Sequence, residues 1–256
     1  MLNFRSVNIT TGILFVLFIC LHFLINMSFW WLLPIGLAWL VLTILGSGLI
    51  GWNYHLKTLN NNPNANNIAI TFDDGPNPDF TPKVLKVLET YRAEATFFCI
   101  GKHIESHPDI IKTIIEHGHT IGNHTYSHAN NFGFFNTQKV IAELQKTNTI
   151  VKNVLGITPC LYRPAFGVTN PKIKRAVKHL HLTTIGWNRR SFDTTNLNEN
   201  QIFNRITKNL KKGDVILLHD TSEKTIRVLE RLLLFLQEKN LQSVTVNDLF
   251  NVKAYA

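Results

Sequence analysis

The sequence predicts an α/β domain built on a parallel β-sheet and preceded by a hairpin of two transmembrane helices. Three observations support this prediction. The N-terminal part has a long segment without charge, the rest alternates short β-type apolar runs with helical stretches, and polar residues come directly after several predicted strands. Such alternation is typical of a parallel sheet covered by helices, which is either a barrel or an open doubly wound sheet.

The N-terminal segment is the most apolar part of the chain. Residues 6–56 contain no Asp, Glu, Lys or Arg, and the polar break within their apolar stretch is at 26–28. Because one bilayer-spanning helix needs ~20 apolar residues, we expect two spans, at about 11–25 and 30–52. A cleaved signal peptide is the alternative for the first span, but no small-residue cleavage site follows it. We therefore assign residues 1–56 to a membrane anchor.

The remaining chain divides into a linker and one domain. Residues 57–67 are rich in asparagine and lack apolar periodicity, which is typical of a linker, and residues 68–256 form the domain. The formal net charge of +9 favours anionic surfaces or polymers as neighbours. The basic residues are scattered and match no nucleic-acid-binding motif, so we expect no nucleic-acid partner. No obligate protein partner is indicated either.

Apolar runs and helix signals give the order of elements within the domain. Proline near the start of three helical stretches and glycine after two of them support the boundaries. The expected strands are 68–72, 95–100, 119–122, 160–162, 182–187, 215–218 and 243–246. The expected helices are 81–91, 108–117, 137–155, 171–179, 199–211 and 223–239.

Chemically capable side chains follow four of these strands. Asp73 and Asp74 follow the first strand, His124 the third, Arg163 the fourth and His219 the sixth. On its own, Asp-Asp-Gly-Pro is typical of a surface turn. However, the carboxyl ends of parallel strands form the edge at which α/β proteins build their sites. The common position of these residues therefore predicts a functional site at that edge.

The residue types at this edge suit a catalytic metal. His124 and His128 lie four residues apart, so on one helical turn both imidazoles would face the same ion. Asp74 would complete a three-ligand set with positions left for water, and among divalent metals Zn²⁺ fits these ligands best. Asp73 is then the candidate base and His219 the candidate acid of a hydrolysis. A metal-dependent phosphoesterase is an alternative, but it usually needs the ligands of two metals.

With these residues identified, the chain resembles the NodB-type polysaccharide deacetylases, the carbohydrate esterase family 4 group, over about residues 68–250. The resemblance implies a distorted (β/α) barrel. Residues 71–76 resemble the first motif of the family, with Asp73 as base and Asp74 as metal ligand. Residues 124–128 resemble the second motif, whose histidines, here His124 and His128, complete the metal site.

Three further motifs assign the remaining site residues by the same resemblance. In the third motif, residues 163–167, Arg163 orients the base and the backbone at Phe166 assists the oxyanion. Trp187 and Asp193 match the fourth motif, in which Asp193 pairs with the acid. In the fifth motif Leu218 lines an acetyl pocket and precedes the acid His219. The sequence departs from the family at two positions, which are Ala165, where proline is usual, and Thr194, where tryptophan commonly follows the aspartate.

The resemblance implies a metal-dependent deacetylase that hydrolyses N-acetyl groups of an amino-sugar polysaccharide, such as peptidoglycan, a chitin-like polymer or an exopolysaccharide. The apolar segment within residues 1–56 implies that this enzyme is anchored in a membrane. The expected partners are this N-acetylated glycan and the membrane, which the protein crosses twice. The charges that flank the spans, Arg5 and Lys57, set no orientation. The position of acetylated glycans places the catalytic domain outside the cell or in the periplasm. Two alternatives are a deacylase of a lipid-linked amino sugar and a non-catalytic glycan-binding protein of the same fold.

Overall fold

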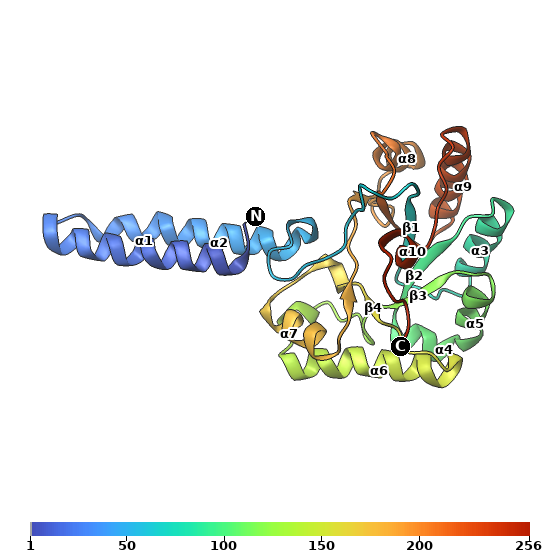
Figure 1. Ribbon diagram of the computed structural model, residues 1–256, viewed down its shortest axis with the longest axis horizontal. Helices are drawn as coiled ribbons and strands as arrows, with labels where there is room; N and C mark the ends of the chain where they lie inside the picture. Colours follow the sequence, from blue (N-terminus) through green and yellow to red (C-terminus); the bar gives the residue numbers. More distant parts are fainter. Residues whose placement is uncertain (1) are drawn as a thin grey trace.

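The computed structural model describes residues 2–256, and its N-terminal part is a helical hairpin that projects from the domain as a rod (Figure 1). Helix α1 (Phe4–Ile25) leads through the short 3₁₀ helix η1 (Phe29–Trp31) into α2 (Leu32–Gly48), and η2 (Ile50–Trp52) follows. Helix α1 begins earlier than expected, because the Asn3 side chain accepts a hydrogen bond from the backbone N–H of Ser6 and caps the helix.

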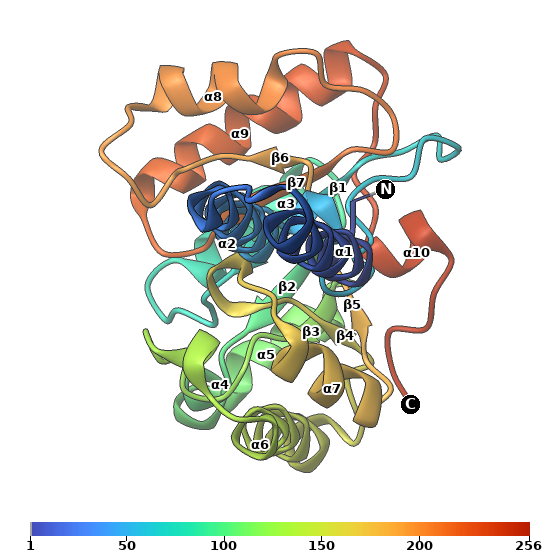
Figure 2. The same cartoon turned by 90° about the vertical axis from the view of Figure 1, so that its left-hand side faces the viewer.

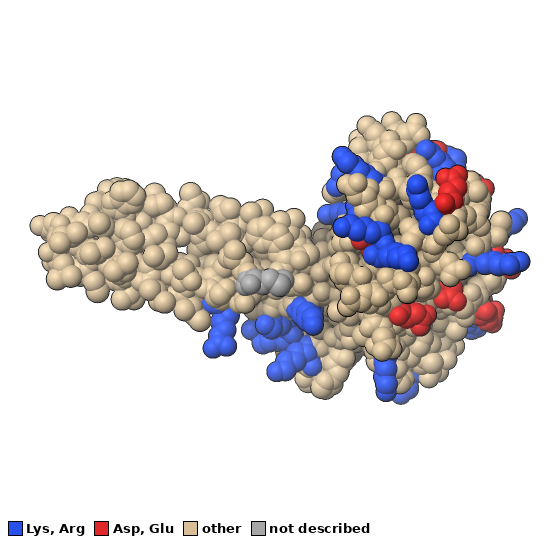
Figure 3. Space-filling view, turned by 45° about the horizontal axis from the view of Figure 1, so that its top comes forward, with Lys and Arg blue, Asp and Glu red and all other residues tan. Residues whose placement is uncertain are grey.

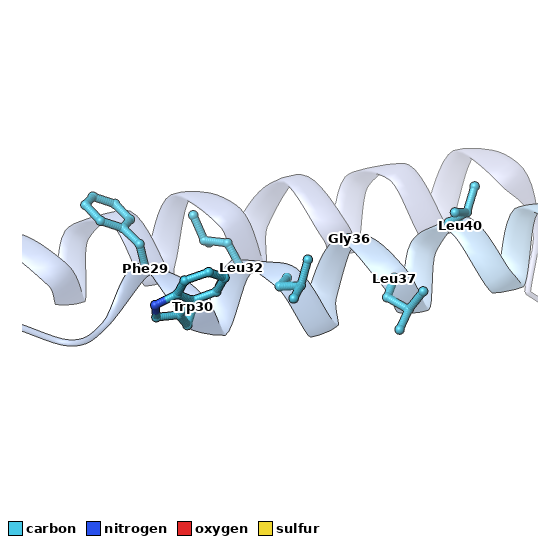
Figure 4. Close-up of a pocket in the computed structure, with 7 residues that line it drawn as sticks. Phe29, Trp30, Leu32, Gly36, Leu37 and Leu40 are labelled. Atoms are coloured by element: carbon cyan, nitrogen blue, oxygen red, sulfur yellow. The ribbon is translucent and has the colours of Figure 1, made fainter.

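The surface of the hairpin is apolar along its length. Both helical segments are long and apolar enough to cross a bilayer. Near the tip and along α2, the side chains of Phe29, Trp30 and Leu37 project away from the helix (Figure 4), and Trp30 is 80% exposed. In the space-filling view the hairpin carries no charged side chain until it approaches the domain (Figure 3). Exposed apolar surface of this extent marks contact with a membrane or a partner.

The domain contains one seven-stranded sheet in which each pairing is parallel, so the α/β prediction is confirmed. The strand order is β5-β4-β3-β2-β1-β7-β6. The strands are β1 (Ala69–Asp73), β2 (Ala95–Cys99), β3 (Thr120–Asn123), β4 (Leu161–Tyr162), β5 (Thr183–Thr184), β6 (Arg189–Arg190) and β7 (Val215–His219).

Helices cover the sheet, with α8 and α9 on one side of the molecule and α6 and α7 on the opposite side (Figure 2). All six predicted helices are present, and α4 and α10 were not predicted. The α-helices of the domain are α3 (Thr81–Thr90), α4 (Gly101–Ser106), α5 (Pro108–Glu116), α6 (Thr137–Leu155), α7 (Pro171–His179), α8 (Glu199–Thr207), α9 (Glu223–Glu238) and α10 (Val246–Phe250). The domain also has two 3₁₀ helices, η3 (Phe132–Phe134) and η4 (Ala165–Gly167).

Two predicted strands differ from the structure. The prediction 182–187 is too long, because pairing with β4 ends at Thr184. The chain then places β6, which was not predicted, beside β7. The prediction 243–246 is wrong, since its only ladder contact is a single bridge between Ile68 and Ser243. The side chain of Thr245 accepts a hydrogen bond from Asp248 N and starts α10 there instead.

The alternation of side chains along the strands separates an outer core from the inner surface of the sheet. Ile70 and Phe72 of β1 pack outward into the main core, against helices that include α3 and α9. Thr71 and Asp73 therefore point inward, as strand geometry requires. All five residues of β1 are buried, so the inward carboxylate of Asp73 sits at the end of a rigid strand.

The asparagine-rich segment 57–67 packs along the domain instead of bridging it loosely to the hairpin. Leu59 N donates to Thr184 O (3.0 Å), Gly186 N donates to Leu59 O (2.9 Å), and Asn60 is buried. The base of the hairpin is attached as well, because Thr169 N donates to Ser47 O at 2.9 Å. The hairpin thus ends beside the loops that follow β4 and β5.

Candidate active site

The predicted site residues meet at the carboxyl edge of the sheet. Asp73 ends β1 and is the register partner of His219, which ends β7. His124 directly follows β3, and Arg163 directly follows β4. Because parallel strands point the same way, side chains from four separate parts of the sequence share one edge. The structure thus brings together the residues that the sequence placed after strands.

The carboxylate of Asp73 is held by the buried guanidinium of Arg163. Nη1 of Arg163 donates to Asp73 Oδ1 at 2.8 Å and to Thr71 Oγ1 at 2.7 Å, while Nη2 donates to Gly186 O at 2.9 Å. Arg163 has no exposed surface, so burial lowers its pKa, and the Asp73 charge acts in the opposite direction. This pairing fixes one oxygen of Asp73 and leaves Oδ2 free to face His124, whose Nε2 lies 3.9 Å away.

Asp74, His124 and His128 form a cluster in which one candidate ligand atom of each residue lies within 4.8 Å of the others. Asp74 Oδ1 is 3.5 Å from His124 Nε2 and 3.4 Å from His128 Nε2. Nδ1 of His124 lies 2.9 Å from Arg163 O, which fixes the ring and directs Nε2 toward the cluster. Asp74 Oδ1 is buried and has no hydrogen-bond partner within the described residues 2–256. Two imidazoles and an unsatisfied buried carboxylate oxygen fit a divalent metal such as Zn²⁺.

The prediction that the two histidines share one helical turn is wrong. Residues 124–128 form a loop in which Thr125 (φ 66°) and His128 (φ 47°) adopt left-handed backbone conformations. Oε2 of Glu143, on α6, accepts hydrogen bonds from Tyr126 N (3.2 Å), Ser127 N (2.8 Å) and Ser127 Oγ (2.8 Å). The loop therefore folds back on itself and brings both rings together without helical geometry.

The three residues of the cluster differ in their pKa shifts. Burial tends to lower the pKa of His124, but the charges of Asp73 and Asp74 raise it overall, so a bound cation would have to displace a proton from this ring. Burial tends to raise the pKa of Asp74, but the neighbouring His124 imidazole and the positive charges of the histidines outweigh this effect and leave the pKa below its ordinary value. Burial, together with the charge of His124, lowers the pKa of His128 to about 4. His128 is thus a neutral imidazole at pH 7, with a lone pair available to a metal.

His219 lies next to a buried aspartate from the fourth motif region. His219 Nδ1 is 2.8 Å from Asp193 Oδ1, and His219 N donates to Asp193 Oδ2 at 2.8 Å. Asp193 is 1% exposed and also accepts from Ser191 Oγ (2.7 Å) and Thr225 Oγ1 (2.9 Å). Burial tends to lower the pKa of His219, but the bond and the charge of Asp193 raise it to about 9. His219 is therefore a cation at neutral pH, suited to donating a proton.

Phe166 and Trp187 lie on the side of the site next to the third motif. Phe166 has a left-handed backbone (φ 58°), is 45% exposed, and its ring centroid lies 4.4 Å from that of His128. Trp187 packs so closely on Gly167 that a Cβ at this position would collide with the indole. The guanidinium carbon of Arg163 lies 5.6 Å from the Trp187 ring centroid, which connects this wall to the Asp73 pair.

The assignment of Leu218 to an acetyl pocket requires correction. Leu218 is fully buried in the main core cluster together with Phe72, between the sheet and its outer helices. Side chains alternate along β7, so Leu217 and His219 share the inward face with their register partners, Thr71 and Asp73. Leu217, two residues before the histidine, is the leucine on the side of the site.

Sequence reasoning missed two carboxyl-bearing residues near the site, the partly buried Glu143 and the buried Asp220. Glu143 holds the histidine loop, and nothing in the sequence connects position 143 with 126–127. Asp220 accepts a hydrogen bond from Thr81 Oγ1, and a Cβ at Gly75 would collide with the Asp220 carboxylate. Burial raises the pKa of Asp220 to about 7. In the sequence, the position of Asp220 directly after His219 was the feature that could have identified it.

A parallel α/β domain with a buried histidine–aspartate pair and a two-histidine, one-carboxylate cluster at one sheet edge fits the class of hydrolases. A family model described as "Polysaccharide deacetylase" matches residues 60–185. A peptidoglycan-N-acetylglucosamine deacetylase of Bacillus cereus is 37% identical over 194 residues, which cover 73% of this chain and 89% of that protein. The peptidoglycan-N-acetylmuramic acid deacetylase PdaC of Bacillus subtilis is 29% identical over 191 residues, covering 75% of this chain and 40% of that protein.

Solved structures agree with the sequence matches. A crystal structure of a peptidoglycan N-acetylglucosamine deacetylase in complex with 4-naphthalen-1-yl-N-oxidanyl-benzamide aligns with a TM-score of 0.73 at 31% identity, covering 78% of this chain and 94% of that chain. A family 4 carbohydrate esterase from Streptomyces lividans in complex with acetate aligns with a TM-score of 0.65 at 28% identity, over 70% and 92% of the two chains.

The chain belongs to the NodB-type polysaccharide deacetylases of carbohydrate esterase family 4. Enzymes of this family act on N-acetyl amide bonds of glycans, and the predicted family and enzyme class are confirmed. The parallel half-barrel of seven strands with its helices matches the distorted (β/α) barrel expected from the resemblance.

Proposed function

We propose that this protein is a metal-dependent deacetylase that removes N-acetyl groups from amino-sugar units of a cell-envelope glycan and is held at the membrane by its N-terminal hairpin. The observation that carries this proposal is the meeting of three kinds of group at one sheet edge. These are a buried aspartate held by Arg163, the Asp74–His124–His128 cluster, and the His219–Asp193 pair. Hydrolysis of an amide needs a base, an electrophile and an acid, and each has a candidate here.

Asp73 is the proposed base. One of its oxygens is occupied by Arg163, which orients the carboxylate, while the other faces the metal cluster. A base in this position can take a proton from the water that attacks the acetyl carbonyl. A divalent cation held by Asp74, His124 and His128 would supply Lewis acidity, and Zn²⁺ suits two imidazoles and one carboxylate best.

His219 is the proposed acid. It is protonated at neutral pH because Asp193 raises its pKa to about 9, so it can donate a proton to the departing amine. The backbone N–H near Phe166, in a loop with left-handed geometry, is the proposed additional donor to the oxyanion. Trp187 and the inward face of β7 are the proposed walls next to the acetyl group.

The two apolar helices and the names of the relatives support a cell-envelope substrate. Relatives that match over most of the domain are described as peptidoglycan deacetylases. We propose that residues 1–56 anchor the enzyme with two spans and that the domain faces outside the cell or the periplasm, where such glycans are found. The absence of a charged residue between positions 6 and 56 supports the anchor.

Acetate release from N-acetylated peptidoglycan, chitin oligosaccharides and exopolysaccharide, with and without chelator, tests this function. We expect release from at least one glycan, loss of release on chelation, and recovery with Zn²⁺. Asp73→Asn and His219→Ala should lower turnover by about 10²–10⁴-fold without unfolding the protein. Full activity of either variant in the presence of metal would remove that residue from the mechanism.

A further inference from the structure

A groove of about 770 Å³ lies where the hairpin meets the catalytic domain. One wall comes from the base of the hairpin and the segment after it, and includes Trp52 and Lys57. The other wall comes from the loop around β6, and includes Trp187, Arg190 and Phe192, with Arg205 of α8 beside them. We call this the junction groove. In the space-filling view, Lys and Arg side chains gather on the surface where the uncharged hairpin meets the domain (Figure 3).

Two guanidinium groups in the junction groove share one aromatic ring. The guanidinium carbon of Arg190 lies 4.6 Å from the Phe192 ring centroid, and that of Arg205 lies 4.3 Å from it. The ion pairs of Lys and Arg with carboxylates in residues 2–256 involve other cations, namely Lys83, Lys112, Arg163, Arg189 and Arg227. Two neighbouring cations without a carboxylate partner repel each other, and a bound anion relieves that repulsion.

The loop that carries these cations also carries the partner of the catalytic acid. Arg190 is three residues before Asp193, which binds His219. Phe192, between Arg190 and Asp193, has φ 60°, an uncommon backbone conformation for a bulky residue, and its ring contacts the guanidinium groups of Arg190 and Arg205. The groove is therefore continuous with the loop that builds the active site.

The opposite wall of the groove leads to the hairpin. Ile50 and Trp52 belong to the 3₁₀ turn that ends the hairpin, and Trp52 is 39% exposed. Asn60 and Ile50 lie against Gly186, directly before Trp187. A ligand with an anionic head group in the groove would thus have the active site on one side and the apolar hairpin on the other.

We propose that the junction groove binds the phosphate or diphosphate of an amino-sugar substrate that is linked to a membrane lipid. Arg190 and Arg205 would contact the phosphate oxygens, the sugar would extend toward His219, and the lipid would run beside the hairpin. Guanidinium groups bind phosphate through paired charge-assisted hydrogen bonds, and stacking on Phe192 orients them. This inference rests on the proposed deacetylase function and specifies the class of substrate that the same site takes.

The test uses the full-length, zinc-loaded protein in phosphatidylcholine vesicles with two substrates that carry the same sugar. One is a soluble N-acetylglucosamine oligosaccharide, and the other is N-acetylglucosamine joined through diphosphate to a polyisoprenol. Loss of a charge-assisted hydrogen bond should raise the KM of Arg190→Gln for the lipid-linked substrate about 10-fold more than its KM for the oligosaccharide. Arg190→Lys, which keeps the charge, should recover part of this difference. Lys86→Gln, an exposed charge change on α3, should alter neither KM.

The outcomes separate this inference from the function on which it rests. If the wild-type protein deacetylates the oligosaccharide but Arg190→Gln raises both KM values equally, the phosphate site is wrong and the deacetylase function stands. If phosphatidylglycerol vesicles accelerate both substrates and Arg190→Gln removes only this acceleration, the groove binds lipid head groups, and the proposal is overturned. If the wild-type protein releases acetate from neither substrate, both the function and the inference fail.

Discussion

Asp193 and His219 form a two-point contact in which one carboxylate binds both the imidazole and the backbone of the same histidine. Asp193 Oδ1 lies 2.8 Å from His219 Nδ1, and Oδ2 accepts from His219 N at 2.8 Å. The ring can therefore not rotate freely, and Nε2 is the nitrogen that faces away from Asp193. The same contact links the loop after β6 to the end of β7, so the acid and its partner depend on the local fold of both segments.

Replacing Asp193 by asparagine should lower the pH above which the proposed acid, His219, loses its proton. The Asp193 charge raises the pKa of His219 to about 9, so without it this pKa falls toward its ordinary value. The activity of Asp193→Asn should decline at a lower pH than that of the wild type, with kcat about 10²–10⁴-fold lower. A bound divalent cation lowers the pKa of His219 in both proteins but does not reverse the order of the two values. The pH–rate profiles of the two zinc-loaded proteins measure this difference in the pH of decline. If their alkaline limbs superimpose, Asp193 does not set the pKa of His219.

The same substitution should affect stability in a pH-dependent manner. Because the folded-state pKa of His219 is raised, its contribution to the free energy of unfolding is fully present below the unfolded-state pKa of ~6.5. That contribution disappears as the pH rises through about 9. The stability difference between wild type and Asp193→Asn should therefore be larger at pH 6 than at pH 10. Urea unfolding at the two pH values provides the measurement, and a difference that grows with pH would contradict the pairing.

Metal binding should depend on the three clustered residues and not on other histidines. At a zinc concentration 100 times its Kd, a single bound ion adds about 2.7 kcal/mol to the free energy of unfolding. For a domain of this size that raises Tm by roughly 5–10 °C. His128→Ala should lose most of this rise because it removes a ligand, whereas His117→Ala, at the exposed end of α5, should keep it. An equal Tm rise in all three proteins would exclude the cluster as the zinc site.

Removing the guanidinium of Arg163 should destabilise the domain strongly. Arg163 has no exposed surface and is the cation that pairs with the buried Asp73 carboxylate. Arg163→Met leaves that charge and the Thr71 hydroxyl without their donor, which should cost about 3–5 kcal/mol. The double variant Arg163→Met/Asp73→Asn should recover part of the loss, because it removes the unpaired charge. Urea unfolding of the three proteins decides, and a loss below about 1 kcal/mol for Arg163→Met would mean that Asp73 is otherwise compensated.

The sequence pattern predicts the position of a residue along the chain better than the face of the sheet to which its side chain points. Positions after strands were predictable, since the carboxyl edge of a parallel sheet follows from the order of elements alone. The face to which a strand residue points was harder to predict. Leu218 was assigned to the acetyl pocket, but Leu217, one position earlier, is the residue on the inward face. A shift of one residue reverses the face of every side chain in a strand.

Other features depend on contacts between distant parts of the chain, which a single sequence does not contain. The loop at 124–128 is shaped by hydrogen bonds to Glu143, which lies on α6. The β6 strand of Arg189 and Arg190 has no apolar pattern, and it forms because β7 offers backbone partners to Arg189 and Arg190. The asparagine-rich segment has the composition of a free linker, yet its backbone is bound to the sheet at Leu59.

The docking of this segment leads to a prediction about where the stable domain begins. Leu59 is bonded to Thr184, the last residue of β5, and to Gly186 just after this strand, and Asn62 N donates to Gly213 O at 2.9 Å. A variant that begins at Ile68 loses these bonds and the buried side chain of Asn60. At about 1 kcal/mol for each intramolecular hydrogen bond, it should be less stable by about 2–4 kcal/mol than a variant that begins at Lys57.

The variant that begins at Lys57 serves as the control, because it removes the hairpin but keeps the docked segment. It loses the bond from Thr169 N to Ser47 O, the contacts of Ile50 and the side chain of Leu56, which is buried at the edge of a core cluster. We expect it to fold and to remain in solution after high-speed centrifugation. Thermal unfolding of both variants tests the boundary. Equal Tm values would mean that the segment 57–67 adds nothing to the fold and that the domain begins at Ile68, whereas a lower Tm for the shorter variant places the boundary before Ile68.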